Sequence, residues 1–136
     1  MHVRVKSVIH ILIADDFEAW RVRVRHLLKA QSEWQIVAEA ADGLEAIRKT
    51  IELRPDIVLL DISMPLANGL EAGGTIFTLW PEAKIIFLSI NNDEKVMGSA
   101  LAMGAKGYVL KANASRELVP TISRALLGLS LVPELR

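Results

Sequence analysis

The chain has 136 residues, of which 51% are hydrophobic and only 5% aromatic, so one domain with a largely aliphatic core is expected. Sixteen basic residues balance sixteen acidic ones, which excludes a global charge that would attract nucleic acid or an anionic membrane surface. The absence of cysteine excludes disulfides, thiolate metal sites and a cysteine nucleophile, and it suits a reducing compartment.

The amino-terminal sequence has neither the pattern of a targeting signal nor that of a membrane span. Its apolar stretch is interrupted by Arg4 and Lys6 and ended by Asp15 and Asp16. We therefore expect a cytoplasmic chain without a membrane partner.

Short apolar runs rich in β-branched residues alternate with longer segments of helical period. The predicted strands are residues 8–14, 35–40, 57–60, 84–89 and 107–110. Five such rounds with short connections are typical of parallel sheets in which a helix follows each strand. The sequence therefore predicts an α/β fold, a single (βα)5 unit doubly wound around a parallel five-stranded sheet.

Apolar residues recur along one face of the intervening segments, as expected for amphipathic helices. The predicted faces are Phe17, Trp20, Val24, Leu27 and Leu28 in the first helix, Leu44, Ile47 and Ile51 in the second, and Leu118, Ile122, Ala125, Leu126 and Leu129 in the fifth. The third helix is expected between residues 68 and 79, and the fourth between residues 92 and 103, with Gly104 as its stop.

Three helical segments depart from the simple pattern. The stretch WRVRVR at 20–25 alternates like an edge strand, but its apolar flanks favour a helix whose arginines form a solvated face; phosphate binding by those arginines is the alternative. Gly73 and Gly74 predict a short or loose third helix, because each costs about 1 kcal/mol relative to alanine. Pro120 lacks the N–H that a helix interior needs, which predicts a late start or a bend in the fifth helix.

Polar side chains stand at the ends of four predicted strands. Asp15 and Asp16 follow the first strand and Asp61 ends the third. Ser89 ends the fourth strand and Lys111 follows the fifth. Because ligands of open parallel sheets bind outside the carboxyl ends of the strands, we expect these five side chains to share one rim of the sheet.

Together these side chains have the chemistry of a phosphoryl-acceptor site. Three carboxylates repel one another unless positive charge lies among them, and a donor set of oxygens alone suits Mg²⁺, with Mn²⁺ as a substitute. If a phosphoryl group is transferred to Asp61, the cation and Lys111 can neutralise the developing charge while Ser89 donates a hydrogen bond. Taken singly, the residues have simpler explanations: capping or solvated acids, a turn-capping serine and a surface lysine.

With these residues in place, the chain resembles the CheY-like receiver domain of two-component response regulators over essentially its whole length. The likeness rests on the motifs LIADD, PDIVLLDISMPLANGLEA, KIIFLSI and GAKGYVLK. The order and spacing of the acidic pair, the acceptor aspartate, the hydroxyl residue and the lysine also agree with the family pattern. The resemblance implies the strand order 2-1-3-4-5 of the flavodoxin/CheY-like fold.

The resemblance also implies a role for each site residue. Asp61 would accept a phosphoryl group from a histidine kinase, with Ser89 and Lys111 in contact with that group. Mg²⁺ would be held by Asp15, Asp16, Asp61 and the backbone carbonyl of Ser63. Tyr108 is similar to the family's switch aromatic, whose inward turn would change the surface of the fourth helix, fifth strand and fifth helix. Such a domain is a signalling phosphoacceptor that assists its own phosphorylation and dephosphorylation, and is not an enzyme with a separate substrate.

The carboxyl-terminal sequence, from ASRELVP to ALLGLSLVPEL, is similar to the NarL/FixJ branch, in which a receiver precedes a linker and a DNA-binding helix-turn-helix domain. We expect residues 1–130 to form the receiver and residues 131–136 to begin a linker or tail. The expected partners are a histidine kinase, an effector domain or partner protein, and a second copy of the chain. The balanced charge predicts no direct nucleic-acid binding by this piece, and a single-domain regulator is the alternative.

Three other functions are less well supported. A phosphorylation-independent interaction module is disfavoured because every residue of the acceptor site is present. A metal-dependent phosphatase with an aspartyl nucleophile usually needs a second acid where this chain has Ser63. A nucleotide-binding flavodoxin-like protein would need a glycine-rich loop after the first strand.

Within the receiver hypothesis, Ile90 stands where the family often has a smaller residue, which predicts a narrowed entrance for small phosphoryl donors.

Overall fold

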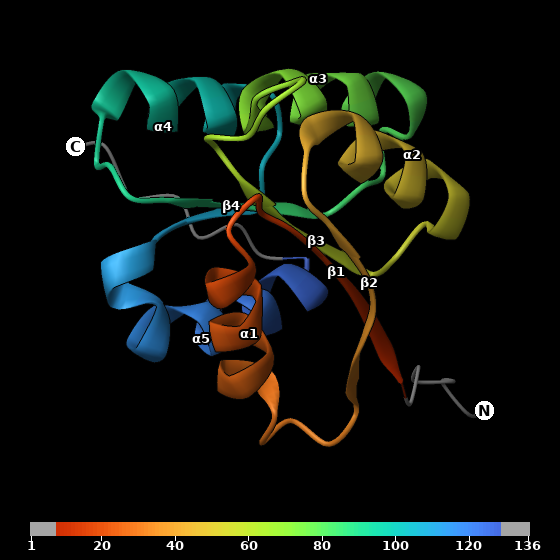
Figure 1. Ribbon diagram of the computed structural model, residues 1–136, viewed down its shortest axis with the longest axis vertical. Helices are drawn as coiled ribbons and strands as arrows, with labels where there is room; N and C mark the ends of the chain where they lie inside the picture. Colours follow the sequence, from red (N-terminus) through yellow and green to blue (C-terminus); the bar gives the residue numbers. More distant parts are fainter. Residues whose placement is uncertain (1–7, 129–136) are drawn as a thin grey trace.

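Five parallel strands form a sheet in the order β2-β1-β3-β4-β5 in the computed structural model, which describes residues 8–128 (Figure 1). The strands are β1 Ile9–Ala14, β2 Trp34–Ala40, β3 Ile57–Asp61, β4 Ile85–Ser89 and β5 Gly107–Leu110. The helices that follow them are α1 Glu18–Leu28, α2 Gly43–Leu53, α3 Gly69–Leu79, α4 Glu94–Ala102 and α5 Ala114–Leu126, with a short 3-10 helix at Lys111–Asn113. The predicted α/β class, the five βα rounds and the strand order are confirmed.

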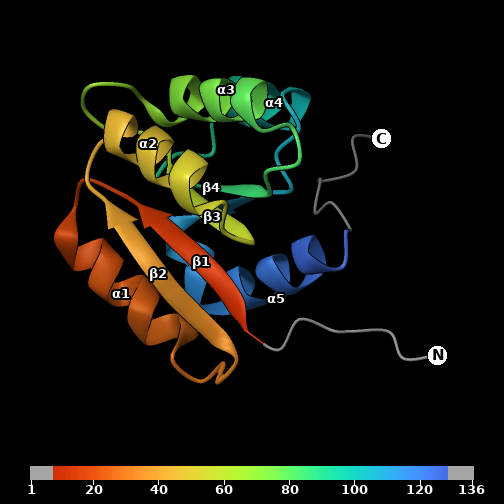
Figure 2. The same cartoon turned by 90° about the vertical axis from the view of Figure 1, so that its right-hand side faces the viewer.

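The helices cover the sheet in two layers. Helices α2, α3 and α4 lie on one face, and α1 and α5 lie on the other (Figures 1 and 2). Because successive strand residues point to opposite faces, β1 sends Leu12 into the core under α2, α3 and α4, and sends Ile11 and Ile13 into the core under α1 and α5. Every residue of β3 and β4 is buried, so the centre of the sheet lies between two apolar layers.

The WRVRVR stretch is helical, as predicted, and Val24 and Leu28 of α1 are buried. Phe17, however, only precedes α1 and is 57% exposed, and Leu44 of α2 is 55% exposed. The predicted inward positions of Phe17 and Leu44 are therefore wrong. The buried residues of α2 are Gly43, Ala46 and Thr50. Their small size lets α2 approach the sheet, and this buried stripe turns the larger Leu44 outward.

Helix α3 is as long as α1 and α2 despite the adjacent Gly73 and Gly74, so the prediction of a short helix is wrong. Asn68 and Glu71 form a reciprocal capping box that stabilises its first turn. A Cβ added at Gly73 would lie 2.7 Å from the ring of Phe87, whereas one added at Gly74 would meet nothing within 4 Å. Gly73 is thus required by close packing of α3 on β4, but the structure gives no reason for Gly74.

Helix α5 begins at Ala114 and contains Pro120 in its interior, so the predicted late start is wrong. The ring of Pro120 faces solvent, while Leu118, Ile122 and Ala125 are buried against the sheet. Burial of this apolar stripe outweighs the one backbone hydrogen bond that the proline cannot make. Leu129 and the predicted boundary after residue 130 lie outside the described residues. Within residues 8–128, no helix is long and apolar enough to cross a membrane.

Candidate functional site

The strand register brings the predicted site residues to one edge of the sheet. Ala14 pairs with Leu60, so Asp15 and Asp61 leave neighbouring strands at the same level. Ser89 pairs with Leu110, and Lys111 follows directly. Since all five strands are parallel, the carboxyl ends of β1, β3, β4 and β5 meet at this edge, as predicted.

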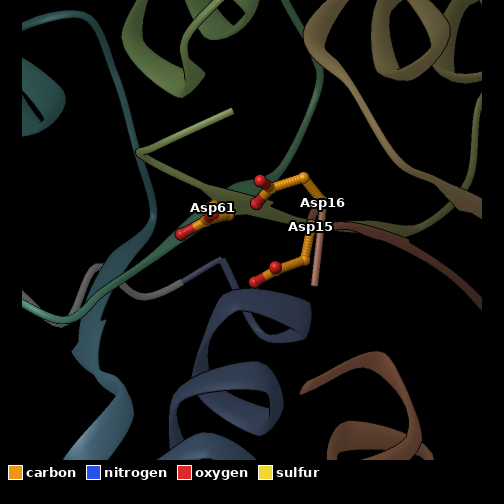
Figure 3. A group of neighbouring side chains, drawn as sticks. All are labelled: Asp15, Asp16 and Asp61. Atoms are coloured by element: carbon orange, nitrogen blue, oxygen red, sulfur yellow. The ribbon is translucent and has the colours of Figure 1, made fainter. Parts of the chain in front are cut away.

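Asp15, Asp16 and Asp61 form an acidic cluster in which one ligand oxygen from each residue lies within 4.8 Å of the others (Figure 3). Asp15 is fully buried, Asp61 is 4% exposed, and Asp16 is exposed. The cluster therefore has two carboxylates embedded in the protein and one at its surface. A small group of oxygen donors that is open on one side suits a divalent cation that keeps part of its water shell.

Lys111 supplies the positive charge beside these acids. Its Nζ lies 2.6 Å from Asp15 Oδ2 and 3.4 Å from Asp61 Oδ1, and its side chain is 14% exposed. The other oxygen of Asp15 accepts a hydrogen bond of 2.8 Å from the backbone N–H of Phe17. Both oxygens of Asp15 are thus engaged within the protein, and Lys111 bridges the two buried carboxylates.

The electrostatic balance leaves Asp61 hard to ionise. The pKa of Asp61 is raised from 3.8 to about 6: burial is the largest cause, the negative charge of Asp15 acts in the same direction, and Lys111 opposes both by its charge and its hydrogen bond. Asp16 makes a smaller contribution in the raising direction. Asp61 is therefore a carboxylate whose charge is costly in the free protein and would be favoured by any added cation.

Two pockets open on either side of Ser63. One is lined by Asp61, Ile62, Ser63, Ser89, Ile90, Asn91, Asp93 and Val96. The other is lined by Asp16, Ser63, Met64, Pro65 and Asn68. The first gives access to the Asp61 side chain from the β4–α4 side, and Ile90, which is 74% exposed, stands at its wall. The second lies over the exposed carboxylate of the acidic cluster.

Ser89 and Tyr108 are linked through the backbone of Asn91. The Asn91 N–H donates to Ser89 Oγ at 3.1 Å, and the Tyr108 hydroxyl donates to the Asn91 carbonyl at 3.2 Å. Ser89 is buried at the end of β4 and Tyr108 is half-buried on β5. A movement of the Ser89 hydroxyl would therefore change its hydrogen bond with Asn91 and, through the Asn91 backbone, the hydrogen bond of the Tyr108 hydroxyl.

The loop that carries Ser63 is held against the sheet edge by two glycines. A Cβ at Gly69 would lie 2.0 Å from the carbonyl oxygen of Asp61, and a Cβ at Gly43 would lie 1.9 Å from the carbonyl oxygen of Ala67. Within the same loop, Leu66 adopts a left-handed conformation with φ of 69°. These contacts require backbone atoms without side chains, and hold the loop close to Asp61.

Arg21 also belongs to the site, although the sequence pattern did not reveal it. Its Nη1 donates to the backbone carbonyl of Asp15 at 2.7 Å, and its Nε donates to Glu39 Oε1 at 2.9 Å. Arg25 pairs with the same glutamate. The predicted solvated arginine face is therefore wrong for Arg21, whose side chain is 16% exposed. The available signal was its position in the first turn of the helix that follows the acidic pair.

Comparisons with known proteins support the family assignment. The response regulator receiver domain family matches residues 11–123. The oxygen regulatory protein NreC of Staphylococcus epidermidis is 40% identical over 119 residues, which cover 87% of this chain and 55% of NreC. The transcriptional regulatory protein DegU of Brevibacillus brevis is 35% identical over 117 residues, which cover 86% of this chain and 50% of DegU. The chain thus spans about half the length of the curated relatives it matches.

Among solved structures, a two-component response regulator of the LuxR family from an Aurantimonas species is similar throughout. It matches with a TM-score of 0.87 and 34% sequence identity, covering 91% of this chain and 89% of the other.

Proposed function

The chain belongs to the response regulator receiver domain family, and from this premise we propose that it is a phosphoacceptor switch in which Asp61 receives a phosphoryl group from a histidine kinase. The observation that carries the proposal is the buried Asp61 carboxylate at a pocket wall, with Lys111 Nζ 3.4 Å away and two more carboxylates beside it. A nucleophile, a cation and an acidic cluster within one small site are what phosphoryl transfer to a carboxylate requires.

In the transfer step, an Asp61 oxygen attacks phosphorus and forms a new O–P bond. The bond from phosphorus to the nitrogen of the kinase phosphohistidine breaks, and that nitrogen keeps the electron pair. Lys111 faces the developing negative charge, and the Ser89 hydroxyl donates to a phosphoryl oxygen. The Ser89 hydroxyl also accepts a hydrogen bond from the Asn91 N–H, and a displacement of the hydroxyl toward the phosphoryl group would lengthen that bond.

The donor set fits Mg²⁺, with Mn²⁺ as a substitute. The ligands would be the carboxylates of Asp15, Asp16 and Asp61 and the backbone carbonyl of Ser63. Such a cation neutralises charge on the acids and on the incoming phosphoryl oxygens. The oxygen-only chemistry of the cluster and its spacing within 4.8 Å support this assignment.

Phosphorylation would be transmitted from Ser89 to Tyr108 through Asn91. Drawing the Ser89 hydroxyl toward Asp61 frees the Asn91 N–H, and the Asn91 carbonyl is the acceptor of the Tyr108 hydroxyl. The tyrosine lies on β5, between α4 and α5 in the fold, so its movement would change the α4-β5-α5 surface.

Tyr108→Phe tests this link, because it removes the hydroxyl and retains the ring. We expect normal phosphorylation of the variant but a weaker change in this surface.

The output would be control of an effector, most simply a carboxyl-terminal DNA-binding helix-turn-helix domain that regulates transcription. This output is supported by the similarity to DegU, a transcriptional regulatory protein, and by the relatives being about twice as long as the matched region. In this arrangement residues 1–130 form the receiver and residues 131–136 begin the linker or tail. The active surface would bind the effector, a partner protein or a second copy of the chain.

Ile90 would limit the access of small phosphoryl donors to Asp61. Its side chain lines the pocket that reaches Asp61 and is 74% exposed, so it stands at the entrance and does not contribute to the core. Ile90→Ala is expected to speed phosphorylation by acetyl phosphate without a matching change in stability.

The test is intact-mass spectrometry after incubation with acetyl phosphate and Mg²⁺. We expect one added phosphoryl group on the wild type, none on Asp61→Asn, and none when EDTA removes the metal. Ile90→Ala is run beside them to separate a blocked entrance from an inactive acceptor. Folded wild type and folded Ile90→Ala that both remain unmodified, also with histidine kinases as donors, would contradict the proposal in favour of a phosphorylation-independent interaction module.

A further inference from the structure

The Lys111 ammonium has a third neighbour besides the two carboxylates. Its Nζ lies 5.0 Å from the centroid of the Trp20 ring, within the range of a cation–π contact. Trp20 is in the first turn of α1, directly before the arginine that binds the Asp15 carbonyl. One ammonium therefore faces Asp15, Asp61 and the indole ring together.

The ring itself is held by apolar packing. Trp20 is partly buried against the core between the sheet and the α1 and α5 layer. Its Nε1–H is buried without a hydrogen-bond partner among the described residues. Leucine or phenylalanine, although smaller, would pack at this position without burying an unpaired donor. The feature that distinguishes tryptophan at this position is its aromatic face, which attracts a cation more strongly than phenylalanine does.

Lys111 needs such a constraint because it is a flexible point charge between two carboxylates. Its contact with Asp15 is 2.6 Å and its contact with Asp61 is 3.4 Å, so electrostatics alone draws the ammonium toward Asp15. Phosphoryl transfer places the new negative charge on the Asp61 side. A third contact that keeps the ammonium between the two acids would preserve its reach toward that charge.

Resting on the proposed function, we propose that Trp20 is a positioning residue for phosphoryl transfer, whose ring holds the Lys111 ammonium between Asp15 and Asp61. The ring does not touch the reacting atoms and acts only through Lys111. The rate of transfer therefore depends on the aromatic face at position 20 as long as Lys111 carries its charge.

The test compares Trp20→Phe and Trp20→Leu in acetyl phosphate reactions at saturating Mg²⁺. Trp20→Leu removes the aromatic face, and we expect its phosphorylation rate constant to fall by about 2- to 30-fold. Trp20→Phe is expected to recover part of the rate because it keeps a weaker aromatic face. Thermal unfolding of both variants measures the loss of packing. If Trp20 had only a structural role, the phosphorylation rate would follow this loss of stability alone.

A double-mutant cycle with Lys111→Met isolates the interaction. We expect Trp20→Leu to have no further effect on the residual rate once the ammonium is gone. A wild-type rate in Trp20→Leu would overturn the inference. It would also be overturned by equal rates in the two Trp20 variants, or by the same rate loss with and without Lys111.

A second readout does not depend on phosphorylation. An aromatic ring over Lys111 shifts the NMR signals of the lysine methylene protons upfield. We expect this shift in the wild type and in Trp20→Phe, and its loss in Trp20→Leu. Absence of the shift in the wild type overturns the inference alone, whereas a present shift in a protein that never accepts a phosphoryl group overturns the proposed function.

Discussion

At the scale of single residues, Asp61 is a buried acid whose charge opposes folding. Burial raises its pKa to about 6, so the folded state holds this proton more tightly than the unfolded state does. The resulting stability is fully present below about pH 4 and is lost as the pH rises through about 6. At neutral pH without metal, the ionised Asp61 therefore destabilises the fold.

Asp61→Asn should for this reason stabilise the metal-free protein at pH 7.5, by about 2 to 3 kcal/mol. The difference from the wild type should shrink as the pH is lowered through 4, because Asp61 then becomes protonated in the unfolded state as well as in the folded state. Urea unfolding in EDTA at several pH values measures it. Glu82→Gln, at an exposed acid, is the control and should follow the wild-type profile. A difference that does not vary with pH would show that the charge of Asp61 is not its cause.

Leu66 carries local backbone strain in the loop beside the site. It has φ of 69° and is 73% exposed, so packing does not compensate for the left-handed conformation. Leu66→Asn should raise the free energy of unfolding by about 0.5 to 1 kcal/mol, because asparagine tolerates this conformation better. Leu44→Asn, at an exposed leucine within α2, is the matched control and should give no gain in the same denaturation experiment. Equal effects of the two substitutions would exclude relief of strain.

At the scale of elements, two of the three glycines of α3, Gly69 and Gly74, should respond oppositely to alanine. Gly69 begins α3, and its added Cβ would lie 2.0 Å from the Asp61 carbonyl oxygen and 2.7 Å from Ile62 Cα. Both neighbours are backbone, so the loop that carries Ser63 must move. Gly69→Ala is expected to lower stability by more than about 2 kcal/mol and to weaken Mg²⁺ binding.

Gly74→Ala, in the same helix, is the control for this substitution. Its Cβ would meet nothing within 4 Å, so the expected effect is a gain of about 1 kcal/mol from helix propensity, with unchanged Mg²⁺ affinity. Thermal unfolding and a Mg²⁺ titration measure both quantities for each variant. Unchanged Mg²⁺ affinity in folded Gly69→Ala would show that this loop does not position the metal ligands.

At the scale of the whole molecule, the three carboxylates of the acidic cluster repel one another at one edge of the sheet. Mg²⁺ binding to the folded state alone should stabilise the whole protein, by about 1.4 kcal/mol at ten times its dissociation constant, and EDTA should reverse the gain. Asp16→Asn should reduce this response, because it removes the exposed carboxylate of the acidic cluster. The midpoint of thermal unfolding with and without Mg²⁺ measures it, and Glu82→Gln should respond like the wild type. An unaltered response in Asp16→Asn would remove that residue from the metal site.

Much of this architecture was predictable because its signals are local. Apolar runs marked the strands, helical periods marked the helices, and the polar residues at strand ends followed from parallel topology. The helix at WRVRVR was correctly identified from its flanks. The inward position of Phe17 was wrong because this residue precedes α1, and that of Leu44 was wrong because α2 buries its small residues against the sheet.

The sequence by itself determined the fold class, the strand order through the family resemblance, and the set of polar side chains brought to one rim. Only the tertiary structure decided how deeply Asp61 is buried, that Arg21 turns inward to the Asp15 carbonyl, and that Trp20 faces Lys111. It also showed that Gly73 packs against Phe87 and is not merely a weak helix residue. The physical reason is that burial and pairing depend on contacts between elements far apart in the chain, and local periodicity does not specify those contacts.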